Sequence, residues 1–296
     1  MARRLMECVA NFSEGRSPET IDAIQSAIGG LLLDRTMDAD HNRSVLTFAG
    51  SPEEVAEAAV RAVGKAAELI DLTIHKGGHP RIGAADVVPF VPLEGISLEE
   101  CAMLAVAAGE RIWREFGIPV YLYEAAARRP ENIRLENIRR GQFEGLREEV
   151  KSNPARRPDI GGPLLHPTAG ATVLGARKFL IAFNVNLATA DLSIAKSIAR
   201  KIRHSSGGFP CVKALGIMLH SHKQAQVSMN LTDFEVTPLN VVIDAVEREA
   251  ALLGTSSDCT ELIGLIPLRA VDPRITNLTS ESILENRIKS SAIIKE

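Results

Sequence analysis

The runs Val45-Leu46-Thr47-Phe48 and Pro89-Phe90-Val91-Pro92-Leu93 are apolar, and a helical pattern separates them. The same arrangement returns in the second half of the chain, as Val227-Ser228-Met229-Asn230-Leu231 and Gly264-Leu265-Ile266-Pro267-Leu268 with a helical pattern between them. Short apolar runs bounded by turn residues predict strands, and apolar residues at a spacing of three to four predict helices. The pattern therefore predicts an internal duplication.

Around these runs, each half shows the order strand-helix-strand-strand-helix-strand. In the first half we expect strands at 6–10, 31–34, 44–48 and 86–93, and helices at 17–28 and 52–69. In the second half we expect strands at 179–184, 212–219, 226–231 and 262–268, and helices at 191–204 and 237–253. Between the halves lie a predicted helix at 97–116, a strand at 119–123, a helix around 130–150 and a segment rich in Pro and Gly at 153–175.

This order predicts an α+β protein of two ferredoxin-like βαββαβ subdomains, residues 1–178 and 179–296, each a sheet with helices on one face. Two such units leave a cleft between them, and clefts between domains are common places for small ligands. We therefore expect a ligand cleft between the two halves.

Composition narrows the class of protein. The net charge of −3 and the 4% aromatic content argue against a nucleic-acid binder. The four cysteines are far apart, which argues against a disulfide framework and favours a reducing, cytoplasmic location. No segment approaches about 20 unbroken apolar residues, so we expect neither a membrane span nor export.

Charge is unevenly distributed. Residues 192–232 contain no Asp or Glu but hold Lys196, Arg200, Lys201, Arg203, Lys213 and Lys223 with His204, His220 and His222. This stretch predicts a surface that attracts anions. A second basic run at 128–157 is interleaved with glutamates, so we interpret it as the solvated face of a helix.

The segment His75-Lys76-Gly77-Gly78-His79-Pro80-Arg81-Ile82-Gly83-Ala84-Ala85-Asp86 concentrates titratable side chains and glycines before an apolar strand. Glycine permits close approach of the backbone, and Pro80 stiffens the turn that presents His79. A histidine can take and return a proton near neutral pH. The segment predicts a catalytic or substrate-binding loop. One alternative is a metal site that includes Asp86, and the other is a purely structural histidine pair. The metal site would require a helix that places both imidazoles on one face, and the glycines and Pro80 argue against such a helix.

Three other segments carry polar or small residues at the ends of predicted elements. Residues 11–16 leave the first strand, where polar groups and free amides can meet a ligand, although Ser13 or Ser17 can simply cap the helix. Residues 38–43 form either a second polar cluster or an ordinary hairpin turn. Residues 167–178 form a loop of small residues that lets a flat ring approach the backbone, or an interdomain linker.

Taken together, these segments resemble the glutamate formiminotransferase family. The resemblance is carried by ECVANFSEGR, DADHNRSV, HKGGHPRIGAADVVPFVPL, IPVYLYEAAA, TAGATVLGARKFLIAFNVNL and QVSMNL, and it runs from about Glu7 to about Pro267. It implies a transferase that moves the formimino group of N-formimino-L-glutamate to N5 of tetrahydrofolate, in histidine breakdown. In some animals this unit is fused to a cyclodeaminase domain, for which we expect the chain to be too short.

The resemblance also implies roles for particular residues. His79 is the expected catalytic base, tetrahydrofolate is the co-substrate, no metal is expected, and a homodimer is favoured. The folate site is expected at Gly161, Gly162, Pro163, Leu164, Leu165, His166, Pro167, Thr168, Ala169 and Gly170, with Lys213 and Gly216. The fused animal enzymes have an aromatic residue where this chain has Ala169, so the pterin ring would need another stacking partner.

The chemistry of the reaction agrees with these residues. A proton must leave the attacking secondary amine and another must reach the departing glutamate nitrogen, and one imidazole can do both. The substrates carry carboxylates, so we expect Asn11, Asn42, Arg43, Arg81 and Lys178 as substrate binders. The alternatives are formyl transfer between 5-formyltetrahydrofolate and glutamate, a non-catalytic folate or anion carrier, and a zinc hydrolase.

Overall fold

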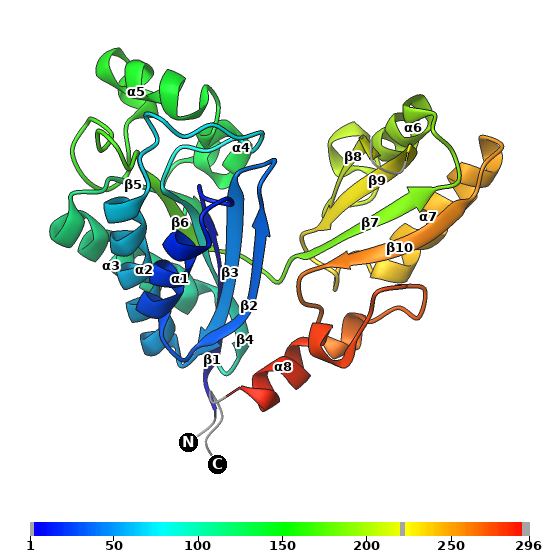
Figure 1. Ribbon diagram of the computed structural model, residues 1–296, viewed down its shortest axis with the longest axis horizontal. Helices are drawn as coiled ribbons and strands as arrows, with labels where there is room; N and C mark the ends of the chain where they lie inside the picture. The colour runs from blue at the N-terminus through cyan, green and yellow to red at the C-terminus, as the bar shows by residue number, and fades with distance from the viewer. Residues whose placement is uncertain (1–2, 220–222, 292–296) are drawn as a thin grey trace. The chain divides into compact units, whose positions relative to one another are not determined.

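The computed structural model describes residues 3–219 and 223–291 and divides the chain into two compact units, residues up to Arg177 and Lys178–Ser290 (Figure 1). Each unit has its own sheet and its own apolar core. His220 and His222, which belong to the acid-free stretch, lie outside the described residues.

The first unit contains a six-stranded sheet in the order β2-β3-β1-β4-β6-β5. β4 pairs with β1 antiparallel and with β6 parallel. Its elements, in chain order, are β1 (Leu5–Phe12), α1 (Pro18–Ile28), β2 (Leu32–Asp38), β3 (Arg43–Gly50), α2 (Pro52–Leu69), β4 (Ala85–Glu94), α3 (Leu98–Phe116), β5 (Val120–Glu124), α4 (Leu135–Ile138), α5 (Gln142–Ser152) and β6 (Thr172–Ala176).

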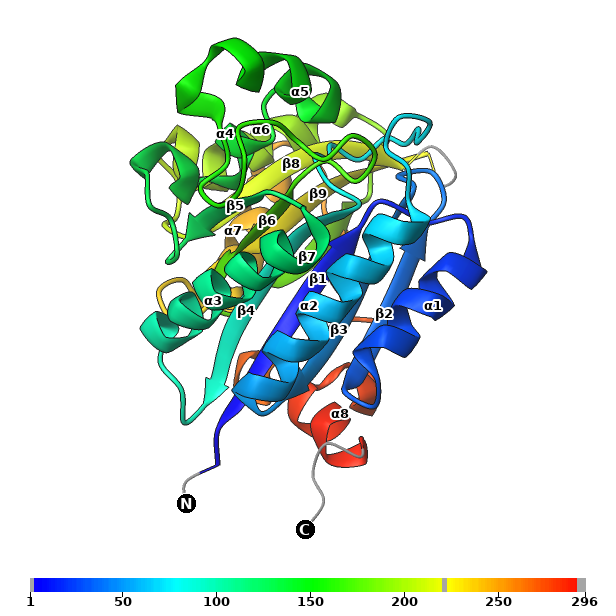
Figure 2. The ribbon, with the colours of Figure 1, turned by 90° about the vertical axis from the view of Figure 1, so that its left-hand side faces the viewer.

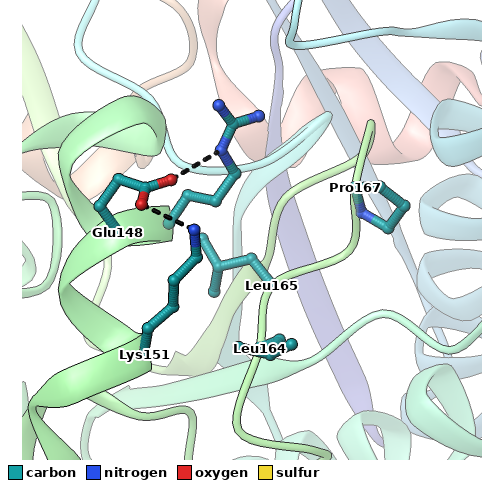
Figure 3. Close-up of a pocket in the computed structure, with 6 residues that line it drawn as sticks. Glu148, Lys151, Leu164, Leu165 and Pro167 are labelled. Carbon is teal, nitrogen blue, oxygen red and sulfur yellow. Dashed lines mark hydrogen bonds and ion pairs between the residues drawn. The ribbon is translucent and has the colours of Figure 1, made fainter.

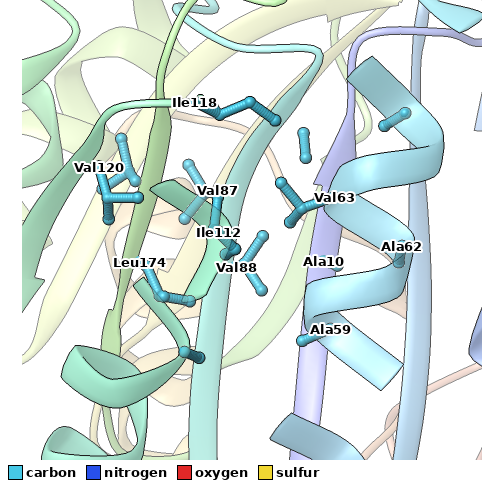
Figure 4. Close-up of a cluster of buried hydrophobic side chains, with 14 of the residues drawn as sticks. Ala10, Ala59, Ala62, Val63, Val87, Val88, Ile112, Ile118, Val120 and Leu174 are labelled. Carbon is cyan, nitrogen blue, oxygen red and sulfur yellow. The ribbon is translucent and has the colours of Figure 1, made fainter. Parts of the chain in front are cut away.

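Figure 2 shows α1, α2 and α3 lying over one face of this sheet. Capping signals in the sequence set their starts: the Ser51 and Ser97 side chains accept hydrogen bonds from the backbone N–H groups of Glu54 and Glu100, which complete capping boxes. Gly117 ends α3 in the left-handed conformation. The apolar faces of α2 and α3 pack on the sheet, as Ala59 and Val63 of α2 and Ile112 of α3 illustrate in Figure 4. Each fully buried valine or isoleucine contributes about 1.5–3 kcal/mol.

The second unit contains a four-stranded antiparallel sheet in the order β10-β7-β9-β8. Its elements are β7 (Ile181–Leu187), α6 (Leu192–Ile202), β8 (Val212–Leu219), β9 (Gln224–Leu231), α7 (Leu239–Leu252), β10 (Ser257–Ile263) and α8 (Leu284–Ser290). Numbered within the unit, this is the order fourth, first, third, second, which β4-β1-β3-β2 also follows in the first sheet. The predicted α+β class is confirmed.

Three predicted elements differ from the structure. The strand expected at 262–268 is β10 at Ser257–Ile263, because Gly264 turns the chain with φ +78° and the apolar run beyond it packs through Ile266 instead. The helix expected around 130–150 is interrupted by Gly141 at φ +83° and splits into a 3-10 turn, α4 and α5. Lastly, β6 lies within residues 167–178, for which a loop of small residues or an interdomain linker was expected.

Candidate active site

The segment between α2 and β4 is held against two other loops by backbone hydrogen bonds. Gly78 N–H and His79 N–H donate to the carbonyls of Asp40 and His41, at 3.2 and 3.3 Å. A Cβ atom on Gly77 would lie only 2.3 Å from the His41 carbonyl oxygen, so this contact requires glycine. The prediction that glycine allows a close backbone approach here is therefore confirmed, and it places His79 beside the turn between β2 and β3.

His75 has a structural role. Its Nε2 lies 3.0 Å from the carbonyl oxygen of Asn42, which can only accept, and its Nδ1 accepts from Arg81 Nε at 3.1 Å. These two bonds require the neutral ring with its proton on Nε2. Burial lowers the pKa of His75, which agrees with that state. His75 thus connects the loop to the turn between β2 and β3 rather than offering a base to a ligand.

Arg81 and Asn42, two of the predicted substrate binders, also hold this loop in place. All five N–H donors of Arg81 are used by acceptors on His75, Gln142 and Glu144, with both Glu144 oxygens taken by the two terminal nitrogens at 2.8 and 3.0 Å. Asn42 accepts from Gly15 N–H and donates to the Lys76 carbonyl. Both side chains therefore fix the loop that carries His79, and their contact with substrate stays a prediction.

His79 is different, because neither of its ring nitrogens has a hydrogen-bond partner among residues 3–219 and 223–291. Burial lowers its pKa to about 3, assisted by the positive charges of Arg139, Arg43 and His41 and opposed by Asp38. The ring is consequently neutral at physiological pH. A neutral imidazole with unused nitrogens can accept a proton from a ligand.

Arg43 and Arg139 supply positive charge next to His79. Arg43 Nη1 donates to Asn11 Oδ1 at 3.0 Å, which joins two predicted binders. Arg139 Nη2 forms an ion pair with the buried carboxylate of Asp86, whose other oxygen accepts from the Ile82 N–H at 2.7 Å. Arg139 was missed by the sequence reasoning, since the interpretation of residues 128–157 as a solvated helix face is wrong at this position. Gly141 was the available signal that no continuous helix face exists there.

The loop at 161–170 docks on the same segment. Ala84 N–H donates to the Ala169 carbonyl at 2.9 Å, and Leu72 N–H donates to the Thr168 carbonyl at 2.8 Å. Gly170 adopts φ +72°, and a Cβ atom there would lie 2.1 Å from the Ile82 carbonyl oxygen. The predicted folate loop and the predicted catalytic loop are thus hydrogen-bonded neighbours. Ala169 is 2% exposed, so its methyl group packs inward.

A hollow of about 370 Å³ lies between α5 and this loop (Figure 3). Leu164, Leu165 and Pro167 form its apolar side. Arg147 and Lys151 are its cations, and both approach the carboxylate of Glu148, with Lys151 at 2.6 Å. The predicted folate loop therefore borders a cavity that offers apolar and charged contacts together.

The remaining predicted residues lie in the second unit. Lys178 forms an ion pair with Asp233 at 2.6 Å, which raises its pKa. Lys213 is exposed on β8. A Cβ atom on Gly216 would lie 2.4 Å from the backbone nitrogen of Lys196 in α6, so glycine at 216 is required by helix-sheet packing. A role of Gly216 in folate binding stays a prediction.

No group of three or more His, Cys, Asp or Glu side chains in 3–219 and 223–291 is arranged to hold a metal ion. In the same part of the chain, every helix is too short or too polar to cross a membrane.

Comparison with known proteins decides the family. The sequence profile of the formiminotransferase domain, N-terminal subdomain, matches residues 5–177, and that of the formiminotransferase domain matches residues 182–277. The chain belongs to the formiminotransferase family. The resemblance read from its motifs is therefore confirmed.

Formiminotransferase relatives match nearly the whole chain. The chain is 45% identical over 272 residues to a glutamate formimidoyltransferase of Streptococcus pyogenes serotype M1, and the match covers 90% of this chain and 91% of the relative. It is 42% identical over 300 residues to a glutamate formimidoyltransferase of Thermoplasma acidophilum, covering 97% and 98%. It is also 45% identical over 278 residues to the formimidoyltransferase-cyclodeaminase of Mus musculus, covering 90% of this chain and 51% of that protein.

Proposed function

We propose that this chain is a glutamate formimidoyltransferase, which transfers the formimino group from N-formimino-L-glutamate to N5 of tetrahydrofolate and releases L-glutamate. The observation that carries the proposal is the neutral, unpartnered ring of His79 beside two arginines, in a chain 45% and 42% identical to proteins named for this activity. A base and an anion-binding charge are the two features that this reaction requires of its site.

In the proposed reaction, N5 of tetrahydrofolate attacks the formimino carbon and forms a tetrahedral intermediate. His79 takes the proton from N5, and the imidazolium then gives a proton to the glutamate nitrogen as its bond to carbon breaks. No covalent intermediate with the enzyme is needed. The low pKa of His79 in the ligand-free protein keeps the imidazole neutral before the reaction, so that the ring can accept the proton of N5.

The binding roles follow from the contacts on each side of His79. Asn11 and Arg43, which are hydrogen-bonded to each other, are proposed to contact formiminoglutamate. The loop at 161–170 is proposed to bind tetrahydrofolate, supported by its docking against the segment that carries His79. Lys178 as a substrate binder, and Lys213 and Gly216 as folate binders, stay predictions.

Other predictions remain part of the proposal. We propose that the subdomains are residues 1–178 and 179–296, and that the protein works as a cytoplasmic homodimer without a metal. Tetrahydrofolate and formiminoglutamate are the proposed small-molecule partners. Relatives named glutamate formimidoyltransferase support tetrahydrofolate as the co-substrate.

The test is to incubate the purified chain with tetrahydrofolate and formiminoglutamate and to follow 5-formiminotetrahydrofolate and free glutamate. A parallel reaction offers 5-formyltetrahydrofolate with glutamate, and a higher kcat/KM for that pair would replace the proposal with formyl transfer. His79→Ala and His79→Asn, neither of which can exchange a proton there, should lose turnover but retain tetrahydrofolate binding. Near-normal turnover in either variant would refute the role of His79.

A further inference from the structure

Two arginines are anchored at one end of the first sheet. Arg43 is the first residue of β3, and its guanidinium is bonded to Asn11 on the adjacent strand β1. Asn11 pairs in turn with Val87 on β4, next to Asp86, which holds Arg139. Arg43, Asn11 and Asp86 therefore lie on three neighbouring strands, and Arg139 reaches the same place from the end of α4.

Asp86 owes its position to an irregularity in the sheet. Asn11 pairs with Val87 but the next residue, Phe12, pairs with Ala85, so Asp86 is an additional residue in β4. Such bulges redirect a side chain and are frequent beside active sites. Here the bulge carries a carboxylate that accepts from Ile82 N–H with one oxygen and binds Arg139 with the other.

Both guanidinium groups retain unused donors. The Nε atoms of Arg43 and Arg139 are buried, and neither has a hydrogen-bond partner among the described residues. Arg43 forms no ion pair within residues 3–219 and 223–291. Asp38 and Asp86 act on its charge without contacting it, whereas Arg139 contacts Asp86 directly. A buried donor without an acceptor and two like charges in proximity are both unfavourable. An anion bound between the two guanidinium groups would compensate the repulsion between their charges.

We propose that Arg139 and Arg43 together bind one carboxylate of formiminoglutamate beside His79, and that Asp86 positions Arg139 for this contact. The inference rests on the proposed formimino transfer, whose donor substrate carries two carboxylates. A carboxylate offers two oxygens to the planar donors of two guanidinium groups, and arginine matches that geometry better than lysine. Arg139 thereby becomes a determinant of donor specificity.

The same arrangement couples substrate binding to catalysis. In the free protein, burial and then the charges of Arg139, Arg43 and His41 lower the pKa of His79, while Asp38, which is bonded to His41, raises it. A bound carboxylate compensates the two arginine charges, so the affinity of His79 for a proton increases. His79 then becomes a stronger base when the donor substrate is in place.

Kinetics of three variants test the binding part of this proposal. Arg139→Gln should raise KM for formiminoglutamate about tenfold or more, since a charge-assisted bond is lost, and leave KM for tetrahydrofolate within about twofold. Arg139→Lys keeps the charge but not the planar fork, so KM for formiminoglutamate should also rise. The control is Arg140→Gln, because that adjacent side chain is 71% exposed and its one ion pair among the described residues is with Glu149 at 3.3 Å. Unchanged KM for formiminoglutamate in Arg139→Gln would overturn the proposal.

Direct titration of His79 tests the coupling without turnover. In protein with ¹³C-labelled histidine, NMR should show that saturating glutarate raises the pKa of His79 by about one unit or more in the wild type. Arg139→Gln should raise the pKa of His79 without glutarate, whereas Arg139→Lys should not. A wild-type pKa that glutarate leaves unchanged would overturn the coupling. Because glutarate is not turned over, this result is independent of whether formimino transfer occurs.

Two further variants control for misfolding of Arg139→Gln. Arg139→Gln leaves the buried Asp86 without its cation, which can unfold the protein. The pair Asp86→Asn with Arg139→Gln removes both charges, and Arg43→Gln removes a cation without stranding a carboxylate. Folded Arg43→Gln should show the same selective rise in KM for formiminoglutamate. An equal rise in KM for both substrates would indicate general disruption and would contradict the clamp.

Discussion

Glu7 is a carboxyl group placed in the middle of the first sheet. It lies on β1 between Ala49 of β3 and Val91 of β4, and it is 1% exposed. Neither carboxylate oxygen has a hydrogen-bond partner among residues 3–219 and 223–291. Burial raises the pKa of Glu7 from 4.5 to about 7, partly opposed by the charge of Arg177. We predict that Glu7→Gln stabilises the protein at alkaline pH.

The size and sign of the effect follow from proton linkage. Between pH 4.5 and about 7 the folded protein holds a proton on Glu7 that the unfolded chain has lost, so stability falls as pH rises through this window. Above pH 7 the cost is constant. A difference in pKa from 4.5 to about 7, at about 1.4 kcal/mol for each pH unit, amounts to roughly 3 kcal/mol. Glutamine has the shape of the protonated acid, so the variant should gain up to this amount at pH 8 and almost nothing at pH 4.5.

The assay is urea unfolding at pH 4.5, 6 and 8, followed by tryptophan fluorescence. Trp113 is the one tryptophan of the chain and lies on α3, in the unit that holds Glu7, so its signal reports the relevant transition. Glu110→Gln, an exposed position on the same helix, is the control. Equal gains for Glu7→Gln at pH 4.5 and pH 8, or a loss at pH 8, would refute the reasoning.

Two other predictions concern the second unit and the pH dependence of turnover. Gly216→Ala should destabilise the second unit by about 1–3 kcal/mol, because the added methyl group meets the α6 backbone. Gly30→Ala is the control and should be close to neutral, because there is open space around that position. Both are measured by circular-dichroism melts, and a loss of folate affinity with unchanged stability in Gly216→Ala would instead favour a direct binding role. For turnover, kcat/KM reports ionisations of the free enzyme, so protonation of His79 should not reduce kcat/KM until the pH is well below 6.5. Measuring the profile from pH 5 to 8 in the Glu7→Gln background separates the two titrations, and a tenfold fall in kcat/KM for each pH unit below 6.5 would contradict the low pKa of His79.

Local signals predicted most of the elements. The helix at 52–69 matches α2 at both ends because Ser51, Pro52 and Glu54 form a complete start signal. The strand at 212–219 also matches β8. The last strand was predicted too far along the chain, because the alternating polar residues of β10 give a weaker pattern than the apolar run that follows it. β6 was overlooked because five residues after a glycine-rich loop show no distinctive period.

The parts of the candidate site that are contiguous in the sequence were predicted, and those that depend on distant residues were not. His79 and its loop could be found because glycines, a proline and titratable side chains are contiguous in the sequence. Arg139 could not, because its partner Asp86 is distant in the chain and the basic run around it resembles a solvated helix. Arg81 was expected to face the substrate, yet its five donors are used within the protein.

The amino-acid sequence by itself determined where most helices and strands form, which loop carries the imidazole and which family the chain resembles, since each depends on residues that are near one another in the chain. Only the tertiary structure decided that His75 is a brace, that His79 is neutral and unpartnered, and that Arg43 and Arg139 stand beside it. The reason is physical: the protonation of a side chain depends on its burial and on charges from distant strands, which folding alone brings together.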